Sequence, residues 1–178
     1  LYLVRHGETR WNQEGRLQGS DVDEPLSLSG HAQAEATAGL LAGVAADDVV
    51  VSPMQRATQT AAICGYDRAR VDDRWIENAL GRWSGRYIDE LMAHSPRQYA
   101  AWRAGRFDPP DGEPFEAVKA RISAAVTDLA HAEVAIVFTH GGTIRAAASE
   151  LVGVDLRMVA AVQAGSISVF QIGDAGAK

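Results

Sequence analysis

The chain has 178 residues, of which 47% are hydrophobic, and a formal net charge of −6 at pH 7. This length and composition fit one globular domain with a substantial buried core, so residues 1–178 are interpreted as a single domain. The acidic balance argues against a general nucleic-acid binder, and no apolar run is long enough to suggest a membrane partner. Cys64 is the sole cysteine, which excludes an intrachain disulfide and favours a cytoplasmic setting.

The first half of the chain alternates between strand-like and helix-like patterns. Residues 1–4 predict a strand, residues 30–44 a helix rich in alanine and leucine, residues 49–51 a second strand and residues 54–64 a second helix. No signal peptide is visible. The first strand-like run begins at the first residue, so an upstream segment or a fused domain is an open alternative.

The second half continues the alternation. Residues 114–129 place apolar side chains on one face and predict a helix, with Pro114 at its first position. The continuous apolar run 134–138 predicts a strand that is buried on both faces. A helix over 143–152 and a strand over 166–172 follow. Strands that alternate with helices predict an α/β fold, here a three-layer α/β/α sandwich around a mostly parallel central sheet.

Residues 80–113 interrupt this alternation. The segment is rich in aromatic residues, and Ser95-Pro96 predicts the start of a short helix. Two interpretations of this helical insert stay open. It forms a lid or pocket wall over a site, or it is an ordinary helical excursion that packs on the domain.

Histidines follow two of the predicted strands. Arg5 and His6 end the first strand, and His140 follows the strand 134–138 and precedes two glycines, of which Gly141 is the first. Ligands of open α/β sheets bind beyond the carboxyl ends of the strands, so we expect both histidines in one pocket. The glycines permit close backbone approach, and the next helix is expected to offer free N–H groups to an anion.

A third strand end adds a second arginine. The strand 49–51 leads into SPMQR, which places Arg56 in the first turn of the following helix. Two arginines and two histidines at one sheet edge predict a site for a tetrahedral, doubly charged oxyanion. Each of these elements alone is a weak signal, and their recurrence at three strand ends is what favours phosphate.

The motifs that carry these residues resemble the histidine phosphatase superfamily, also called the phosphoglycerate mutase-like family. The resemblance covers nearly the whole chain, and the motifs occur in the family's order: RHGETRWNQEGRLQG at 5–19, SPMQRATQTA at 52–61, ENALGRWSG at 77–85 and THGG at 139–142. It implies a phosphoglycerate mutase-like fold and a histidine acid phosphatase-type phosphoric monoester hydrolase. Dimers are common in the family, so the resemblance also raises the expectation of a homodimer.

The resemblance implies a role for each matching residue. His6 would be the nucleophile that forms a phosphohistidine, and Glu77 would protonate the leaving oxygen and later accept a proton from water. Arg5, Arg56 and His140 would complete the catalytic set by stabilising charge in the transition state. The expected phosphate-binding residues are Arg5, Asn12, Arg56, His140 and Gly141, and the expected contacts to the rest of the substrate are Gln18 and Gly19.

Two features leave details open. Asp72 and Asp73 are the nearest alternatives to Glu77 as the proton donor. Ile76 stands where many family members carry an arginine, which puts any substrate assignment in doubt. The physiological substrate is therefore left open among sugar phosphates, phosphoglycerate derivatives, nucleotide-loop intermediates and phosphoproteins.

No cofactor is expected. The remaining histidines have no partners at metal-ligand spacing and are interpreted as surface residues: His31, His94 and His131. The pair Asp21 and Asp23 follows no apolar strand, unlike a DxD phosphatase nucleophile, and no GxxxxGK[ST] loop is present. The chemistry is therefore expected to need neither a metal nor a nucleotide.

The leading interpretation is a metal-independent phosphomonoesterase that acts on a small phosphorylated metabolite. One alternative is a phosphoglycerate mutase, which would return the phosphoryl group to its substrate. The compact chain favours hydrolysis, because mutases of the family are longer. The other alternative is a non-catalytic binder of a phospholigand or phosphoprotein, which the complete set of catalytic residue types disfavours.

Overall fold

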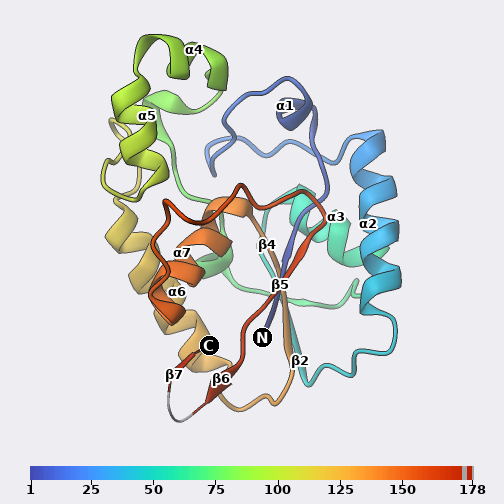
Figure 1. Cartoon of the computed structure of the whole chain (residues 1–178). Coiled ribbons are helices and arrows are strands. Elements are labelled where there is room, and N and C mark those ends of the chain that lie inside the picture. The colour runs from blue at the N-terminus through green and yellow to red at the C-terminus, as the bar shows by residue number, and fades with distance from the viewer. Residues whose placement is uncertain (174–175, 178) are drawn as a thin grey trace.

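The computed structural model describes residues 1–173 and 176–177, and a sheet runs through its centre between two layers of helices (Figure 1). In this part of the chain the central sheet has five strands in the order β3-β2-β4-β1-β5. Their bounds are Tyr2–Arg5 for β1, Asp48–Val51 for β2, Arg70–Val71 for β3, Ala135–Thr139 for β4 and Ile167–Val169 for β5. β5 pairs antiparallel with β1 and the other pairs are parallel, so the predicted sandwich with a mostly parallel sheet is confirmed.

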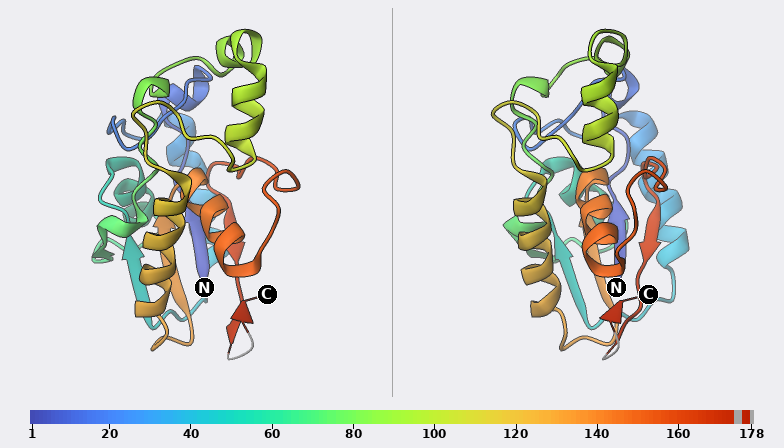
Figure 2. Two further views of the ribbon diagram at one scale, coloured as in Figure 1. Left: turned by 90° about the vertical axis from the view of Figure 1, so that its left-hand side faces the viewer. Right: turned by 60° about the vertical axis from the view of Figure 1, so that its left-hand side comes forward.

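Two helices cover each face of the sheet (Figure 2). α2 (Leu28–Leu41) and α3 (Gln55–Ile63) lie on one face, and α6 (Phe115–Asp128) and α7 (Gly141–Val152) lie on the other. Every residue of β4 is buried, as its continuous apolar sequence predicted. Each large apolar side chain in such a strand contributes about 1.5–3 kcal/mol through burial.

A smaller group of helices stands beyond the carboxyl edge of the sheet (Figure 1). It contains the 3₁₀ turn η2 (Gly81–Trp83) and the helices α4 (Ile88–His94) and α5 (Pro96–Arg103). Leu17, Leu80, Trp83 and Leu91 form its own buried cluster. The helix that begins at Pro96 was predicted from Ser95-Pro96, and α4 was not, because Tyr87 at its N-cap gives no such start signal.

Element ends differ from the sequence prediction where capping decides them. α2 begins two residues earlier than expected because the Ser27 side chain accepts a hydrogen bond from the Gly30 N–H at 3.1 Å. Pro114 is the N-cap of α6 rather than its first helical residue. The expected strand over 166–172 covers only Ile167–Val169, and the strands β6 (Ile172–Gly173) and β7 (Gly176–Ala177) that follow pair antiparallel with each other.

Besides α4, η2 and the pair β6 and β7, three more short elements were not predicted. They are α1 (Arg10–Gln13), β3 with its two residues, and the 3₁₀ turn η1 (Asp73–Trp75). Each is too short for a hydrophobic period to repeat within it. Local contacts mark them instead: Thr9 caps α1, Asp72 caps η1, and Arg70 of β3 pairs with Asp48.

Candidate active site

The two site histidines follow paired positions of adjacent strands. Arg5 at the end of β1 pairs with Thr139 at the end of β4. His6 and His140 are therefore the first residues after these two neighbouring strands. The backbone N–H of His6 donates to the Thr139 carbonyl at 3.0 Å. The two imidazole rings lie side by side with centroids 5.1 Å apart.

The His6 ring is oriented by its own backbone. Its Nδ1 lies 2.6 Å from the Gly7 carbonyl oxygen. A carbonyl can only accept, so Nδ1 carries the proton and Nε2 keeps a free lone pair. Burial lowers the pKa of His6 well below its usual range, and the positive charges of Arg5 and Arg56 lower it further. The ring is therefore a neutral imidazole with an available nucleophilic nitrogen.

His140 is also neutral, but both of its nitrogens are engaged. Its Nε2 lies 2.7 Å from the Ser52 hydroxyl, and its Nδ1 accepts from Arg56 Nε at 3.2 Å. Burial lowers its pKa well below the usual range, with Arg56 as the next cause. In this arrangement His140 holds Ser52 and Arg56 in place and offers no free hydrogen-bond donor to a ligand.

Arg56 is fully buried and all three of its nitrogens are used. Besides His140 it donates to the backbone carbonyls of Gly19 and Val22, at 3.2 and 3.1 Å. Burial lowers its pKa to about 10, which still leaves the guanidinium charged at neutral pH. Arg56 thus fastens the loop after α1 to the base of the site and supplies positive charge beside His6.

Arg5 differs from Arg56 in having a free donor. Its Nη1 donates to the Val162 carbonyl, whereas its buried Nε has no hydrogen-bond partner among the described residues. A β carbon added to Gly141 would lie 3.4 Å from this Nε. Gly141 therefore leaves room beside an unpaired cationic donor, which is what a phosphoryl oxygen would need.

Glu77 lines the same cavity as Arg5 and His6. Its buried carboxylate accepts hydrogen bonds from the backbone N–H groups of Gly142 at 3.0 Å and Thr143 at 3.2 Å. The hydroxyl of Thr143 also donates to the Ile76 carbonyl. The helix N-terminus that was expected to offer several free N–H groups to a ligand is thus largely occupied by Glu77, whose negative charge the helix dipole favours.

The alternative acids lie elsewhere. Asp72 binds Arg74 through two side-chain contacts and caps η1, and neither Asp72 nor the exposed Asp73 lines the cavity beside His6. The Arg74 guanidinium lowers the pKa of Asp72. Of the three carboxylates considered from sequence, Glu77 is the one that the fold places beside His6.

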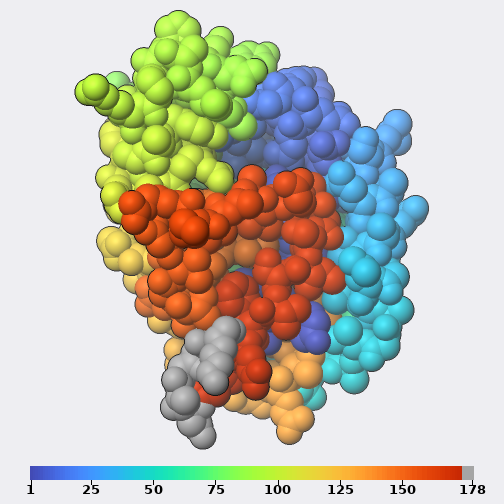
Figure 3. Space-filling view, in the orientation of Figure 1, coloured from blue at the N-terminus to red at the C-terminus, as the bar shows by residue number. Residues whose placement is uncertain are grey.

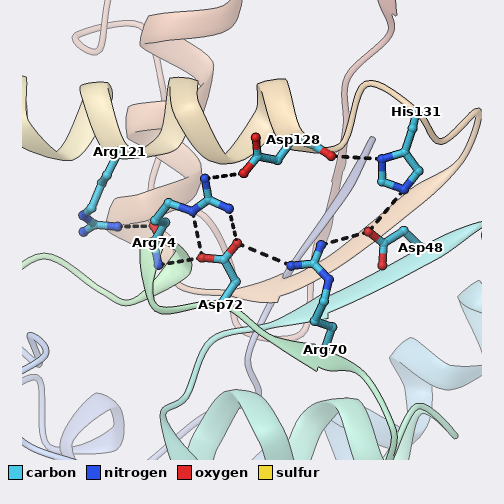
Figure 4. A network of polar contacts seen from close by, with 7 residues as sticks. All are labelled: Asp48, Arg70, Asp72, Arg74, Arg121, Asp128 and His131. Atoms are coloured by element: carbon cyan, nitrogen blue, oxygen red, sulfur yellow. Dashed lines mark hydrogen bonds and ion pairs between the residues drawn. The ribbon is translucent and has the colours of Figure 1, made fainter.

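The contacts of Asp72 belong to a larger ion-pair network (Figure 4). Arg74 joins Asp72 to Asp128 at the end of α6, and Arg70 joins Asp72 to Asp48 at the start of β2. Ion pairs near the surface contribute about 0–1 kcal/mol each, so the main consequence of these pairs is positional. They fix the segment that runs from β3 through η1 to Glu77.

A cavity of about 230 Å³ opens next to these groups. Its lining includes Arg5, His6, Asn12, Gln18, Glu77 and Gly141. Its outer wall comes from three segments far apart in the sequence, which meet at the surface in Figure 3: the N-terminal region, the helices α4 and α5, and the chain that follows α7. Gly19 does not line the cavity, and its carbonyl serves Arg56 instead.

Sequence reasoning did not identify several residues of the outer wall. These include Arg16, Asn78, Trp102, Arg103, Phe115 and Arg145. Arg16, Asn78 and Arg145 lie inside or beside the motifs that were recognised, so motif position was an available signal for them. The others come from the insert and from the start of α6, where no periodic pattern marks a cavity wall.

The remaining three histidines and the single cysteine do not line the cavity. His31, His94 and His131 are exposed, and Cys64 is half-buried with a thiol pKa raised to about 11 by burial. Within residues 1–173 and 176–177, no three histidine, cysteine or acidic side chains are grouped so that they could hold a metal ion. No helix in that part of the chain combines the length and apolarity needed to cross a membrane.

Comparison with known proteins fits this arrangement. The profile of the histidine phosphatase superfamily (branch 1) matches residues 1–178. The chain belongs to this superfamily. As a histidine phosphatase it is 39% identical to fructose-2,6-bisphosphatase TIGAR of Xenopus tropicalis over 128 residues, which are 68% of this chain and 46% of that protein. The match thus spans about half the length of this curated relative.

Other relatives differ in their activities. Adenosylcobalamin/α-ribazole phosphatase of Escherichia coli is 31% identical over 86% of this chain and 79% of its own length. A probable phosphoglycerate mutase, GpmB of Enterobacter, is 35% identical over 72% of this chain and 61% of its own. Among solved structures, a mycobacterial glucosyl-3-phosphoglycerate phosphatase complexed with VO3 has a TM-score of 0.87 and 30% identity, covering 96% of this chain and 92% of that one.

Proposed function

We propose that this histidine phosphatase is a metal-independent phosphomonoesterase that hydrolyses a small phosphorylated metabolite through a phosphohistidine on His6. The observation that carries the proposal is the joint placement of a neutral His6 with a free Nε2, the unpaired Nε of Arg5, and Glu77 around one cavity. This would make it a phosphoric monoester hydrolase of the histidine acid phosphatase type. The phosphatases among its relatives support the same reaction class.

The reaction would take two displacements. In the first, the Nε2 lone pair of His6 forms a bond to phosphorus, the ester P–O bond breaks, and protonated Glu77 gives its proton to the leaving alcohol oxygen. In the second, Glu77 takes a proton from water, the resulting hydroxide oxygen bonds to phosphorus and the P–N bond breaks. Inorganic phosphate leaves, and His6 and Glu77 return to their starting protonation states.

Negative charge spreads over the phosphoryl oxygens in the transition state, and hydrogen-bond donors are needed to stabilise it. Arg5 Nε, the Asn12 side chain and the backbone N–H of Gly141 are the groups that we assign to this role, since all three residues line the same cavity as His6. Arg56 and His140 do not line it in this structure. We infer that Arg56 acts through its positive charge, and that direct contact by His140 would require its ring to leave Ser52.

The helical insert 80–113 would serve as a pocket wall, because Ile88 and Trp102 line the outer part of the cavity. Gln18 would contact the alcohol portion of the substrate from the opposite wall. A homodimer stays a prediction from the family resemblance. A cytoplasmic setting stays a prediction from the single cysteine.

Phosphate release in excess EDTA tests the proposal. The purified chain would be assayed on p-nitrophenyl phosphate and on a panel of metabolic phosphomonoesters, with His6→Ala as the comparison. We expect release that survives EDTA and is lost in His6→Ala. Loss of all release in EDTA with recovery on adding a divalent metal would contradict metal independence.

The mutase alternative has one specific support, the similarity to probable phosphoglycerate mutase GpmB. The two reactions differ in the fate of the phosphoryl group. With 3-phosphoglycerate as substrate, a phosphatase releases inorganic phosphate, whereas a mutase forms 2-phosphoglycerate and responds to a bisphosphoglycerate primer. Tight binding of esters without either product would instead favour the non-catalytic binder.

A further inference from the structure

We infer that Arg121 and Glu113, two residues outside the cavity, form an ion pair that positions the carboxylate of Glu77 for proton transfer. The pair holds both ends of the segment 74–79, which carries Glu77, and so sets where its proton lies relative to the leaving oxygen. The inference rests on the proposed function, in which Glu77 protonates the leaving group, and adds two positioning residues to it. It is drawn from the hydrogen bonds that other parts of the fold make to this segment.

The segment 74–79 has little regular structure of its own. It begins in the last two residues of η1 and continues without helix or strand until η2 begins at Gly81. Glu77 is nevertheless buried. No helical or strand ladder orders the backbone on which this carboxylate stands, so its carbonyl groups need partners from elsewhere in the fold. The position of Glu77 therefore depends on contacts between segments far apart in the sequence.

The middle of the segment is bonded to the sheet edge and to α7. The Thr139 hydroxyl donates to the Trp75 carbonyl at 2.7 Å, and the Thr143 hydroxyl donates to the Ile76 carbonyl at 2.9 Å. Both threonines are buried, one at the end of β4 and the other in the first turn of α7. These bonds hold the middle of the segment against the sheet edge that carries the site.

One ion pair reaches both ends of the segment. Arg121 of α6 donates through Nη1 to the Arg74 carbonyl at 2.5 Å (Figure 4). Its Nε and Nη2 donate to the two carboxylate oxygens of Glu113, at 2.8 and 3.0 Å. The backbone N–H of Glu113 in turn donates to the Ala79 carbonyl at 2.8 Å. The pair thus joins the first and the last residue of the segment through a bidentate contact.

The geometry of this pair distinguishes it from the exposed ion pairs of the chain. The Arg121 side chain is 16% exposed and the Glu113 side chain 23%. All three nitrogens of the guanidinium are engaged, so its planar fork serves a carboxylate and a carbonyl at once, which a lysine ammonium cannot reproduce. Neither residue lines the cavity beside His6. An effect of the pair on catalysis would therefore pass through the segment that it holds.

A leaving-group comparison tests the inference. Phenyl phosphate and p-nitrophenyl phosphate share one ring, but phenol is the poorer leaving group and depends more on the proton of Glu77. The kcat/KM of each ester would be measured in EDTA, because this quantity covers binding and the first displacement, in which the acid acts. In Arg121→Gln we expect the ratio of phenyl to p-nitrophenyl phosphate to fall by about tenfold, since a misplacement of about 1 Å can cost up to about 10²-fold. Loss of folded protein alone would lower both values equally and leave the ratio unchanged.

Two further variants make the result specific, and circular dichroism checks the folding of each. Glu113→Gln keeps the backbone N–H that serves Ala79 but removes the charge that holds Arg121, so the ratio should fall in the same direction. It decides the outcome if Arg121→Gln does not fold. Arg82→Gln is the matched control, because Arg82 pairs with Asp111, two residues before Glu113 and outside the segment 74–79. Its ratio should equal that of the wild type.

The double variant Glu77→Gln, Arg121→Gln separates positioning from an independent effect. If Arg121 acts through Glu77, its loss should not lower the ratio further once residue 77 has no proton to give. Three results would overturn the inference and leave the proposed function intact: an unchanged ratio in the folded Arg121→Gln or in the variant that replaces it, an equal fall in Arg82→Gln, or a further fall in the double variant. A ratio that Glu77→Gln itself leaves unchanged would contradict the acid role in the proposed function, and the inference would fall with it.

Discussion

The guanidinium Nε of Arg56 donates to Nδ1 of His140 across 3.2 Å, and this contact fixes the tautomer of the ring. A guanidinium has no acceptor, so Nδ1 is unprotonated and the proton lies on Nε2, toward the Ser52 hydroxyl. His6 has the opposite tautomer, because its Nδ1 faces the Gly7 carbonyl. The two neighbouring histidines thus differ in which nitrogen carries the proton.

This difference is directly measurable. We predict that two-dimensional ¹H–¹⁵N spectra of the imidazoles at pH 7 identify His6 as the Nδ1–H tautomer and His140 as the Nε2–H tautomer. Arg56→Lys should perturb the His140 resonances most, since it removes the Nε donor. Finding the proton of His6 on Nε2 would remove the free nucleophilic nitrogen on which the proposed chemistry depends.

A second prediction concerns the proton carried by Glu77. Glu77→Gln should lower turnover of alkyl phosphates by about 10²–10⁴-fold, the usual contribution of general acid–base catalysis. The loss on p-nitrophenyl phosphate should be smaller in the first step, because a good leaving group needs no proton. Burst kinetics separate the two displacements. Equal losses of the first step on both kinds of ester would remove Glu77 from the acid role.

Gly142 offers an independent way to disturb the same carboxylate. A β carbon at this position would lie 2.4 Å from Glu77 Oε1, so Gly142→Ala must displace the carboxylate. We predict the same leaving-group pattern as for Glu77→Gln, with a circular dichroism spectrum like that of the wild type. Full activity of Gly142→Ala on alkyl phosphates would show that the position of Glu77 at the helix N-terminus is unimportant.

Acid should destabilise the fold through the two buried imidazoles. Their pKa values are lower in the folded chain than the usual value of 6.5, so below about pH 6.5 the unfolded chain binds more protons. The contribution of the two neutral imidazoles to the free energy of unfolding is therefore fully present above that pH. It falls as the pH drops toward the folded pKa values, by up to about 1.4 kcal/mol per pH unit for each histidine. Urea unfolding at pH 7.5 and 5.5 measures this, and the double variant His6→Asn, His140→Asn should show a smaller difference. An unchanged difference would place the acid sensitivity elsewhere.

Two glycines of α2 give a matched pair of stability measurements. A β carbon on Gly30 would lie 2.1 Å from the Glu8 carbonyl oxygen, which is backbone of the loop after His6, whereas nothing lies within 4 Å of one on Gly39. Gly30→Ala should destabilise by more than about 2 kcal/mol through this overpacking, and Gly39→Ala should stabilise by up to about 1 kcal/mol through helix propensity. Thermal unfolding of both variants checks the contrast, and similar melting temperatures would contradict it.

The sequence predicted the sheet and its main helices because β4 and the helices around it carry long, regular apolar patterns. It also placed His6 and His140 at strand ends, where the register of β1 and β4 makes them neighbours. It did not predict that Glu77 occupies the N–H groups of Gly142 and Thr143, since that contact joins segments 65 and 66 residues apart. Such a contact depends on how η1 is held by ion pairs, which no local pattern encodes.

The outer cavity was the least predictable part. Arg103 and Arg145 meet through a backbone carbonyl of α5 and a side chain of α7. Arginines are frequent in this chain, and residue type alone could not separate a guanidinium that is engaged within the fold from one that is free. The role of each arginine is recognised only when its partners are known.

The central claim is that a phosphoryl group passes through His6. Rapid quenching of the enzyme during turnover of p-nitrophenyl phosphate in EDTA, followed by peptide mass spectrometry under alkaline conditions, tests it most directly. We predict a phosphoryl group on His6 that accumulates in Glu77→Gln and is absent from His6→Ala. A phosphoryl group on any other residue, or continued turnover by His6→Ala, would contradict the account.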